Sequence, residues 1–202
     1  YALVARAVLR AERGKAHQAQ FRYMKLKQQV NPHFLFNSLN ILDCLVCEQR
    51  TEQASAYIHK LAGIYRYMLQ NEEETLVRLR EEMAFVGMYV DLLQVRFPEG
   101  FRVETDIPDE AMNRHVLPCS VQLLIENAIK HNSVGADRPL VIRIVAGAGA
   151  VTVSNNLQLK VSGTTSTRVG LNYIRQQYLD LSGIPIGIRR TDTEYCVTLP
   201  LL

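Results

Sequence analysis

The spacing of apolar residues changes near residue 97 of this 202-residue chain, and this change constrains the fold more than any other feature. Before residue 97 the apolar residues recur every three or four positions, as on one face of a helix, with almost no strand pattern. After it, short alternating segments typical of strands lie between helical ones. The sequence therefore predicts an all-helical part followed by a part that mixes helices and strands.

Two amphipathic helices are predicted in the first part. One apolar stripe runs through residues 21–45, and a second runs through residues 54–68. We expect Thr51 to cap the second helix and Asn71 to end it. Two helices with a short connection form an antiparallel hairpin, which alone buries little apolar surface. We therefore expect a second copy of the chain to complete a four-helix bundle.

A third amphipathic helix is predicted over residues 83–97. It follows the acidic pair Glu81 and Glu82, and it precedes Pro98, which cannot continue a helix. We interpret it as a connection between two domains. The expected organisation is a helical-hairpin dimerisation domain over residues 1–75, the connecting helix over 76–97 and an α/β domain over 98–202.

The second part alternates strands with helices. Strands are expected over residues 101–105, 140–145, 151–154, 184–189 and 195–199. One helix is expected to open at Pro118 and run to about Asn132, and another is expected from Gly170 to about Leu181. Helices and strands in this order indicate a two-layer α/β sandwich.

Composition and charge exclude several classes of protein. The chain has 23 Lys and Arg against 20 Asp and Glu, a net charge of +3, and no basic run, so we do not expect it to bind nucleic acid. No segment approaches the roughly 20 consecutive apolar residues of a membrane span. Cys44 and Cys47 lack the second ligand pair that a zinc site requires. Because Tyr1 replaces an initiator Met, we expect the chain to be part of a longer protein.

One histidine stands beside a proline in the first helical stripe. In QQVNPHFLFNSLN, Pro32 removes a backbone hydrogen bond and is expected to kink the helix. His33 follows it, and Asn37 lies one turn later on the same face. The imidazole is either a structural group satisfied by Asn37 or a nucleophile that Asn37 orients by fixing its tautomer.

A polar face adjoins the apolar stripe of the helix over LLIENAIKHN. Asn127, Lys130 and His131 share this face, and Glu126 lies about 100° around the helix. The pattern fits either an ordinary solvated face or a site for nucleotide phosphates. In the second case the Asn127 carbonyl oxygen suits Mg²⁺, and Lys130 and His131 suit phosphate oxygens. Glu126 would then be a candidate proton acceptor.

A further anion site is indicated where a helix begins at Arg168-Val169-Gly170-Leu171, directly after a Ser/Thr/Gly-rich tract. The unpaired backbone N–H groups of a helix N-terminus attract anions, and a glycine there allows close approach. Many helices begin in this way, so the feature gains meaning only beside the two segments above.

Taken together, these segments resemble the LytS/YehU-like sensor histidine kinases, whose ATPase domain belongs to the GHKL group. NPHFLFNSLN at 31–40 looks like the H-box of that family, and IENAIKHN at 125–132 looks like its N-box. VTVSNN at 151–156 stands where the D-box belongs, and TRVGLNYI at 167–174 looks like the second glycine box. The first two motifs are highly specific, and they occur in the order of the family.

The resemblance implies a dimeric helical hairpin followed by a Bergerat-type two-layer sandwich that binds ATP and Mg²⁺. His33 would accept the γ-phosphoryl group and Asn127 would hold Mg²⁺, while the expected nucleotide contacts also include Lys130, His131, Asn155, Arg168, Gly170 and Leu171. The phosphoryl group would then pass to an aspartate of a response regulator, commonly one with a LytTR DNA-binding domain. Family members usually carry membrane-spanning sensor segments upstream, which implies a location on the cytoplasmic side of the bacterial inner membrane.

Three positions depart from the pattern of the family. Asn155 replaces the D-box aspartate that reads the adenine amino group, and no glycines follow it. Arg168 stands where the second glycine box often begins with Gly, and is a candidate phosphate clamp. Phe34 follows His33 where many histidine kinases have an acid, so Glu126 is only a candidate base. Two alternatives remain open: a degenerate, non-catalytic kinase that acts as a dimeric signalling scaffold, and another GHKL ATPase in which His33 is structural.

Overall fold

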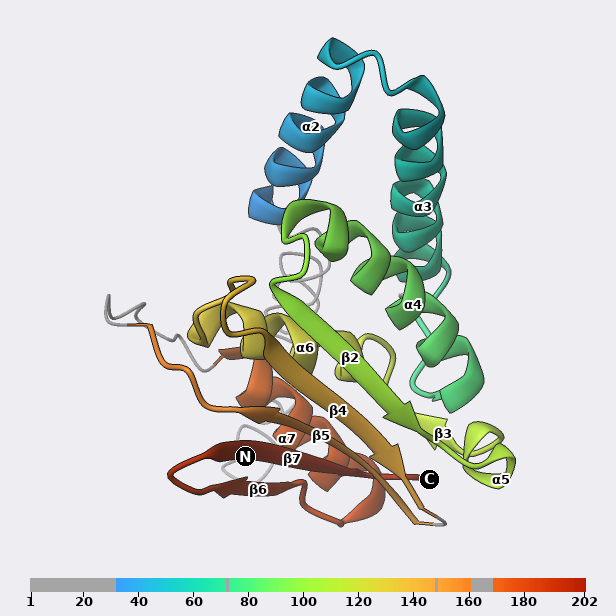
Figure 1. Ribbon diagram of the computed structural model, residues 1–202. Coiled ribbons are helices and arrows are strands. Elements are labelled where there is room, and N and C mark those ends of the chain that lie inside the picture. Colours follow the sequence, from blue (N-terminus) through green and yellow to red (C-terminus); the bar gives the residue numbers. More distant parts are fainter. Residues whose placement is uncertain (1–31, 72, 148, 161–168) are drawn as a thin grey trace, which may run out of the picture. The chain divides into compact units, whose positions relative to one another are not determined.

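The computed structural model describes residues 32–71, 73–147, 149–160 and 169–202 (Figure 1). The chain forms two compact units, Tyr1–Asn40 and Ile41–Leu202, and each is described by itself. Residues 32–40 of the first unit begin helix α2 (Pro32–Cys47). Residues 21–31 of the first apolar stripe lie outside the described residues, and so does the part of the helix that would establish a kink at Pro32.

Helix α3 (Thr51–Gln70) confirms the second predicted helix but not its cap. The N-cap residue is Arg50, whose carbonyl oxygen accepts the Ala54 N–H at 2.9 Å, so Thr51 is already helical. At the other end, the backbone and side-chain amides of Asn71 both donate to the Tyr67 carbonyl oxygen, at 3.1 and 2.9 Å. Asn71 therefore ends the helix, as predicted.

Helix α4 (Leu79–Arg96) begins at Leu79 rather than at Met83. The predicted order of an acidic pair followed by a helix was wrong, because Glu81 and Glu82 belong to the first helical turn. Carboxylates are stabilised there by the partial positive charge of the helix N-terminus. Glu81 also accepts the Arg78 N–H at 3.3 Å, which closes the first turn.

Helices α3 and α4 pack against each other. The rings of Tyr67 and Phe85 stack with their centroids 4.3 Å apart, and Lys60 pairs with Asp91 at 2.6 Å. Phe85 and Ile64 are fully buried, so an apolar core joins the two helices. The domain boundary expected near residue 97 stays a prediction.

A mixed five-stranded sheet forms the second layer of the larger unit, in the order β2-β4-β5-β7-β6. Strands β2 and β4 are parallel, and the remaining neighbours are antiparallel. The strands are β2 (Phe101–Asp106), β4 (Leu140–Ala146), β5 (Ala150–Asn156), β6 (Gly187–Arg190) and β7 (Glu194–Pro200). All five predicted strands are present within a few residues of their expected positions.

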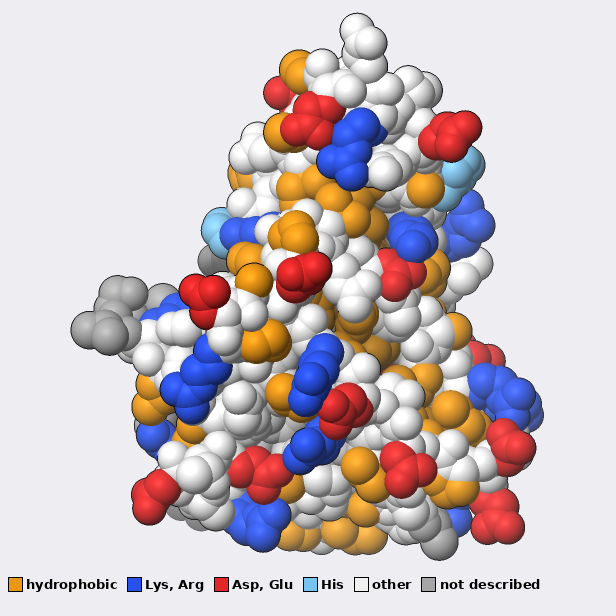
Figure 2. Space-filling model, viewed as in Figure 1, with side chains coloured by type: hydrophobic (Ala, Val, Ile, Leu, Met, Phe, Trp, Pro, Cys, Tyr) orange, Lys and Arg blue, Asp and Glu red, His pale blue; other side chains and the backbone are white. Residues whose placement is uncertain are grey.

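Helices α6 (Ser120–His131) and α7 (Val169–Ser182) cover one face of this sheet (Figure 1). Ile142 and Ile144 are fully buried beneath them, whereas the alternate residues Arg143 and Val145 are exposed. The predicted two-layer arrangement of helices on a sheet is confirmed. On the face of the molecule drawn in Figure 2, acidic and basic side chains are interspersed.

Some short elements were not predicted. Strand β1 (Val77–Arg78) pairs antiparallel with β3 (His115–Val116), and α5 (Asp109–Met112) forms one helical turn. Segments this short carry no readable periodicity. Helix α6 also begins later than predicted: Pro118 precedes it, and Cys119 is its N-cap residue, with a φ of +61°. The mixed helix and sheet class is confirmed, while the four-helix bundle needs a second chain and stays a prediction.

Candidate functional site

The predicted contact between His33 and Asn37 is present on α2. The Asn37 Nδ2 atom lies 3.0 Å from His33 Nδ1 and 3.4 Å from Nε2. Their spacing of one helical turn places both side chains on one face. The imidazole of His33 is exposed, and Asn37 is half-buried. His33 is therefore held by its neighbour and open to solvent, unlike a core histidine.

Helix α6 buries one face and leaves the predicted polar residues at the surface. Val121 and Ile125 are fully buried, whereas Asn127 and His131 are half-buried and Lys130 is exposed. Within the described parts of the chain, the Asn127 side chain has no hydrogen-bond partner. Lys130 and His131 lie one turn beyond it on the same face.

The C-terminal end of α6 is fastened to the segment that follows β5. Asn132 is buried, and its Oδ1 accepts the Gln158 N–H at 2.8 Å. The Lys160 ammonium donates to the carbonyl oxygens of Ile129 and Lys130, each at 3.1 Å. A cation at a helix C-terminus is favourable because carbonyl groups there carry partial negative charge. Sequence patterns could not reveal this contact, because no local spacing relates residues 130 and 160.

Several basic side chains lie near this end of α6. The pKa of His131 is lowered by burial and by the positive charges of Lys130 and Lys160. The pKa of Lys160 is lowered by burial and by Arg96. Burial is the larger cause of both shifts, and the neighbouring positive charges act in the same direction.

Asn155, at the expected D-box position, faces the helical layer. It is buried and alternates with the buried Val151 and Val153 along β5, on the side that α6 covers. Its Nδ2 donates to the Asn156 carbonyl oxygen at 2.7 Å, which fixes the orientation of the amide.

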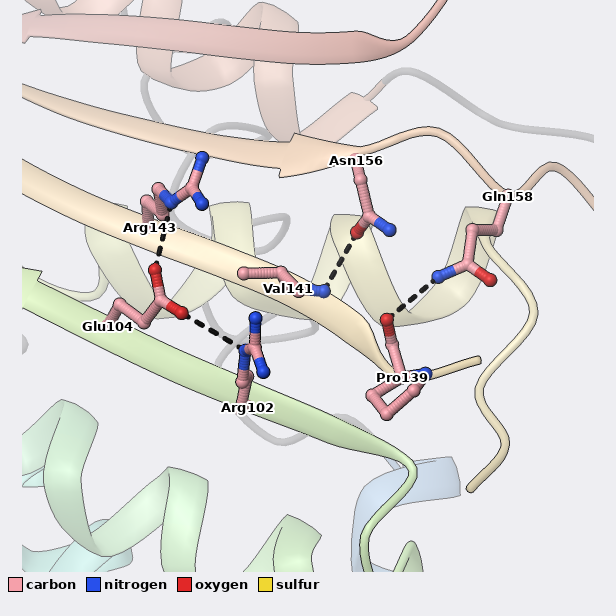
Figure 3. A network of polar contacts seen from close by, with 7 residues as sticks. All are labelled: Arg102, Glu104, Pro139, Val141, Arg143, Asn156 and Gln158. Atoms are coloured by element: carbon pink, nitrogen blue, oxygen red, sulfur yellow. Dashed lines mark hydrogen bonds and ion pairs between the residues drawn. The ribbon is translucent and has the colours of Figure 1, made fainter. Parts of the chain in front are cut away.

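Polar contacts also connect the beginning of β4 to the end of β5 (Figure 3). Asn156 Oδ1 accepts the Val141 N–H at 2.8 Å, and Gln158 Nε2 donates to the Pro139 carbonyl oxygen at 3.0 Å. Further along, Glu104 pairs with Arg102 at 3.0 Å and with Arg143 at 2.9 Å on the exposed face of the sheet. The Asn156 contact joins β4 to β5, the strand that carries Asn155, and the Glu104–Arg143 pair joins β2 to β4.

The beginning of α7 approaches α6 closely. A Cβ atom at Gly170 would lie 2.9 Å from Leu123 Cδ2, so the glycine allows the two helices to approach. Leu171 follows it and is half-buried. Arg168 and the Ser/Thr/Gly-rich tract lie outside the described residues. Gly170 is therefore explained by packing against α6 as well as by its place at a helix start.

The candidate base Glu126 turns toward α4 and away from the Asn127 face. Its Oε2 accepts a hydrogen bond from Gln122 at 3.0 Å. Burial raises the pKa of Tyr89, and the negative charge of Glu126 raises it further. Glu126 thus lies in a polar group with Gln122 and Tyr89, between α4 and α6. Its contact with α4 did not follow from its helical position alone.

A buried carboxylate was missed by the sequence reasoning. Glu82 on α4 has none of its surface exposed, and it accepts hydrogen bonds from the Tyr67 hydroxyl and the Cys119 and Val121 N–H groups, at 2.7, 2.9 and 3.0 Å. Burial raises its pKa to about 7, although the hydrogen bonds act in the opposite direction. The available signal was its spacing, because Glu82 lies in one helical stripe with Leu79 and Val86.

The described segments contain no group of three or more His, Cys, Asp or Glu residues that could hold a metal ion. None of their helices is both long enough and apolar enough to span a bilayer.

Comparison with known proteins agrees with the two motifs. The histidine kinase family matches residues 21–101. The sensor protein LytS of Bacillus cereus is 39% identical over 106 residues, which are 52% of this chain and 18% of that protein. The sensor protein LytS of Staphylococcus haemolyticus is 29% identical over 190 residues, which are 86% of this chain and 32% of that protein. The chain thus spans less than a third of the curated relatives it matches.

These matches show what the chain is similar to: residues 21–101 resemble histidine kinases. The predicted resemblance to the LytS-type sensor histidine kinases is confirmed. Among solved structures, a bacterial phosphotransferase resembles it with a TM-score of 0.48 and 12% identity, over 90% of this chain and 94% of that one.

Proposed function

We propose that this chain is the catalytic part of a two-component sensor histidine kinase, which transfers the γ-phosphoryl group of ATP to His33 and then to an aspartate of a response regulator. The proposal rests chiefly on the exposed imidazole of His33, held 3.0 Å from the Asn37 amide inside the segment that matches the histidine kinase family. Such a ring is accessible to a phosphate donor and provides a nitrogen nucleophile.

The Asn37 amide would select the ring nitrogen that reacts. Nδ2 is a donor, so the Nδ1 atom it faces accepts, and the neutral ring then carries its proton on Nε2. A half-turn of the amide places Oδ1 there instead, where it accepts from Nδ1–H and keeps the proton off Nε2. We expect this second arrangement in the reactive state.

In the transfer step, the electron pair of Nε2 forms a bond to the γ-phosphorus. The bond from that phosphorus to the bridging oxygen breaks, ADP leaves with the electron pair, and the ring loses its Nδ1 proton to water or a base. Phosphoryl transfer depends mainly on positioning and on neutralisation of charge. Glu126, whose Oε2 accepts a hydrogen bond from Gln122, is the candidate proton acceptor.

The polar face of α6 fits the phosphates and metal of Mg-ATP. Asn127 would hold Mg²⁺ through its amide oxygen, since this ion takes few protein ligands and retains several waters. Bound Mg²⁺ would neutralise charge on the phosphate oxygens. Lys130 and His131 would contact those oxygens directly, and Lys160 adds a positive charge fixed at the same helix end.

Asn155 would read the adenine amino group. Because its Nδ2 is already bound to the Asn156 carbonyl oxygen, its Oδ1 is the group that remains for a donor. At the start of α7, Gly170 and Leu171 would line the phosphates, and Arg168 would clamp them.

We expect the working form to be a homodimer. Large apolar side chains are exposed on α2 and α3: Phe36, Leu39, Val46, Ile58 and Leu69. A four-helix bundle formed with a second copy would cover such side chains. By kinship with the LytS proteins, the chain would lie on the cytoplasmic side of a bacterial inner membrane, below an upstream sensor, and a LytTR-type regulator would be its partner.

A non-catalytic dimeric scaffold is the second candidate. It is favoured by the amide pair at residues 155 and 156, which leaves the D-box position without a carboxylate. On this alternative the chain would dimerise and bind its partners without binding ATP.

Labelled ATP distinguishes the two candidates. The chain is incubated with γ-labelled ATP and Mg²⁺ beside His33→Gln and Asn127→Ala variants. We expect acid-labile, alkali-stable label on the wild type only, with ATP binding retained by the His33→Gln variant. Label on the His33→Gln variant would contradict the assignment of His33, and absence of both label and ATP binding in the wild type would favour the scaffold.

A further inference from the structure

Helix α6 is capped at its N-terminus by a side chain from another helix. Its own N-cap residue, Cys119, makes no side-chain cap hydrogen bond. Instead the Glu82 carboxylate of α4 accepts the Cys119 N–H through Oε2 at 2.9 Å and the Val121 N–H through Oε1 at 3.0 Å. Both carboxylate oxygens thus serve a helix end whose donors would otherwise lack partners.

Two features of this cap are energetically unfavourable. Glu82 is fully buried, and in the described residues no Lys or Arg forms an ion pair with it. A buried carboxylate is unfavourable unless hydrogen bonds compensate it. Cys119 has a φ of +61°, which strains any residue with a side chain. The buried carboxylate and the strained residue are hydrogen-bonded to each other. We infer that this contact has a role in addition to packing.

The same carboxylate reaches the last turn of α3. The Tyr67 hydroxyl donates to Glu82 Oε2 at 2.7 Å. The Tyr67 ring stacks on Phe85 of α4, and its carbonyl oxygen accepts both amides of Asn71 at the end of α3. One buried group therefore connects the end of α3, the first turn of α4 and the first turn of α6.

We propose that Glu82 is a positioning residue for the nucleotide site: with Tyr67, it couples the last turn of α3 to the helix that carries Asn127. Asn127 lies about 9 Å beyond Val121 on α6, at the usual rise per residue. A short helix moves as a unit over that distance, so a shift of its capped end changes the placement of Asn127. The inference rests on the proposed function, because it concerns the helix proposed to hold Mg-ATP.

The coupling should respond to protons. Glu82 faces Tyr67 from α3, Cys119 from the turn before α6 and Tyr178 from α7, with Glu81 beside it on α4. Burial raises the pKa of Tyr67, and it raises the pKa of Tyr178 to about 12, so both stay protonated near neutral pH. Burial raises the pKa of Glu82 itself to about 7. Protonation turns one of its oxygens into a donor and weakens the hydrogen bonds that this oxygen accepts.

The test compares three conservative variants of the full chain. Glu82→Gln keeps the shape of the side chain but removes one acceptor oxygen, and Tyr67→Phe removes one hydroxyl and keeps the ring stack. Tyr65→Phe is the matched control, because the Tyr65 hydroxyl is buried in α3 and has no hydrogen-bond partner among the described residues. Calorimetry measures the binding of a non-hydrolysable ATP analogue with Mg²⁺, below and above pH 7.

We expect Tyr67→Phe and Glu82→Gln each to weaken binding about 3- to 30-fold, and the double variant to lose no more than the worse single one. Tyr65→Phe should bind as the wild type does. The wild-type affinity should change as pH passes through about 7, and this step should be absent in Glu82→Gln. Equal binding by all variants, or a pH step that persists in Glu82→Gln, would overturn the inference.

Hydrogen exchange without nucleotide separates this inference from the proposed function. Amides around Asn127 should exchange faster in Tyr67→Phe and Glu82→Gln than in Tyr65→Phe. If the wild type does not bind the analogue, the proposed function fails, and the exchange data still decide whether the coupling exists. Unchanged exchange in both variants would refute the coupling.

Discussion

The two ends of helix α6 use their polar groups in opposite ways. At the N-terminus, the Glu82 carboxylate is fully buried, and both of its oxygens accept backbone N–H groups. Toward the C-terminus, Asn127 is half-buried, Lys130 is exposed, and the Asn127 amide has no partner within the described part of the chain. The N-terminal donors of the helix are thus satisfied by a side chain from α4, whereas toward the other end the side chain of Asn127 has no partner in the described part of the chain.

This difference separates structural polar groups from functional ones. The N-terminus of a helix is ordinarily the place where an anion binds. Here the protein supplies a carboxyl group from α4, and in the proposed function the phosphates of the nucleotide bind elsewhere. The proposed place is the other end of the same helix, beside Lys130 and Lys160. The following predictions test this division.

The largest effect is expected when the Glu82 carboxylate is removed from the N-terminus of α6, which we call the closed end. Glu82→Ala leaves the Tyr67 hydroxyl and the Cys119 and Val121 N–H groups without their acceptor. Buried donors without partners are costly, so the free energy of unfolding should fall by about 3–5 kcal/mol. Urea denaturation measures it. Glu81→Ala, which removes only an exposed acceptor beside it, should cost about 1 kcal/mol or less.

The closed end should also set the dependence of stability on pH. The pKa of Glu82 is about 7 in the folded chain, against 4.5 as the ordinary value, so the folded state binds the proton more tightly. Its contribution to stability is therefore full below pH 4.5 and is lost as pH rises to about 7. We expect a fall of a few kcal/mol over this window. A Glu82→Gln variant with the same fall would show that another group titrates.

Toward the C-terminus of α6, which we call the open end, a substitution should affect ligand binding more than stability. Asn127→Ala removes an amide with no partner in the described residues, so the free energy of unfolding should change by less than about 0.5 kcal/mol. Binding of Mg-ATP should nevertheless weaken by about 10-fold or more, as expected when a metal ligand is lost. Asn113→Ala, at an amide outside the site, should bind Mg-ATP normally. A destabilised Asn127→Ala variant that binds Mg-ATP normally would contradict the proposal that Asn127 serves ligand binding rather than stability.

The smallest effect concerns two glycines in helices. Gly170→Ala places a Cβ atom 2.9 Å from Leu123 Cδ2, whereas Gly87→Ala meets nothing within 4 Å. Alanine favours a helix by about 0.5–1 kcal/mol over glycine, so Gly87→Ala should raise stability by that amount. At Gly170 the contact with Leu123 should cancel the gain. Thermal melting compares them, and equal stabilisation would show that α7 does not need this close approach.

Much of the fold was predictable because amphipathic spacing reports which face of an element is buried. The spacing located α3, α4, α6 and α7 and the strands of the sheet. The spacing did not locate the beginning of α4, because Glu81 and Glu82 lie inside its first turn. It also did not locate the beginning of α6, where a tertiary contact provides the cap. Glu82 provides the cap of α6 from a distant position in the chain, so no residue near Pro118 could reveal where that helix begins. Strands β1 and β3 are too short to be read at all.

The candidate site was predictable where its residues lie one helical turn apart. The His33–Asn37 contact follows from that spacing, and the shared face of Asn127 and Lys130 does too. Long-range contacts were not predictable in the same way. Lys160 reaches the end of α6 through the fold of the sheet, and Glu126 turns toward α4 because Gln122 and Tyr89 provide its polar surroundings.

The most direct test of the account is to map where the nucleotide binds along α6. An isotope-labelled sample of the whole chain is titrated with Mg²⁺ and a non-hydrolysable ATP analogue, and its backbone amide resonances are followed by nuclear magnetic resonance. We predict the largest shifts at residues 127–131 and 155–160, and only small ones at 119–122. Shifts centred on 119–122, or none along α6, would contradict the central claim that the phosphates bind away from the end capped by Glu82.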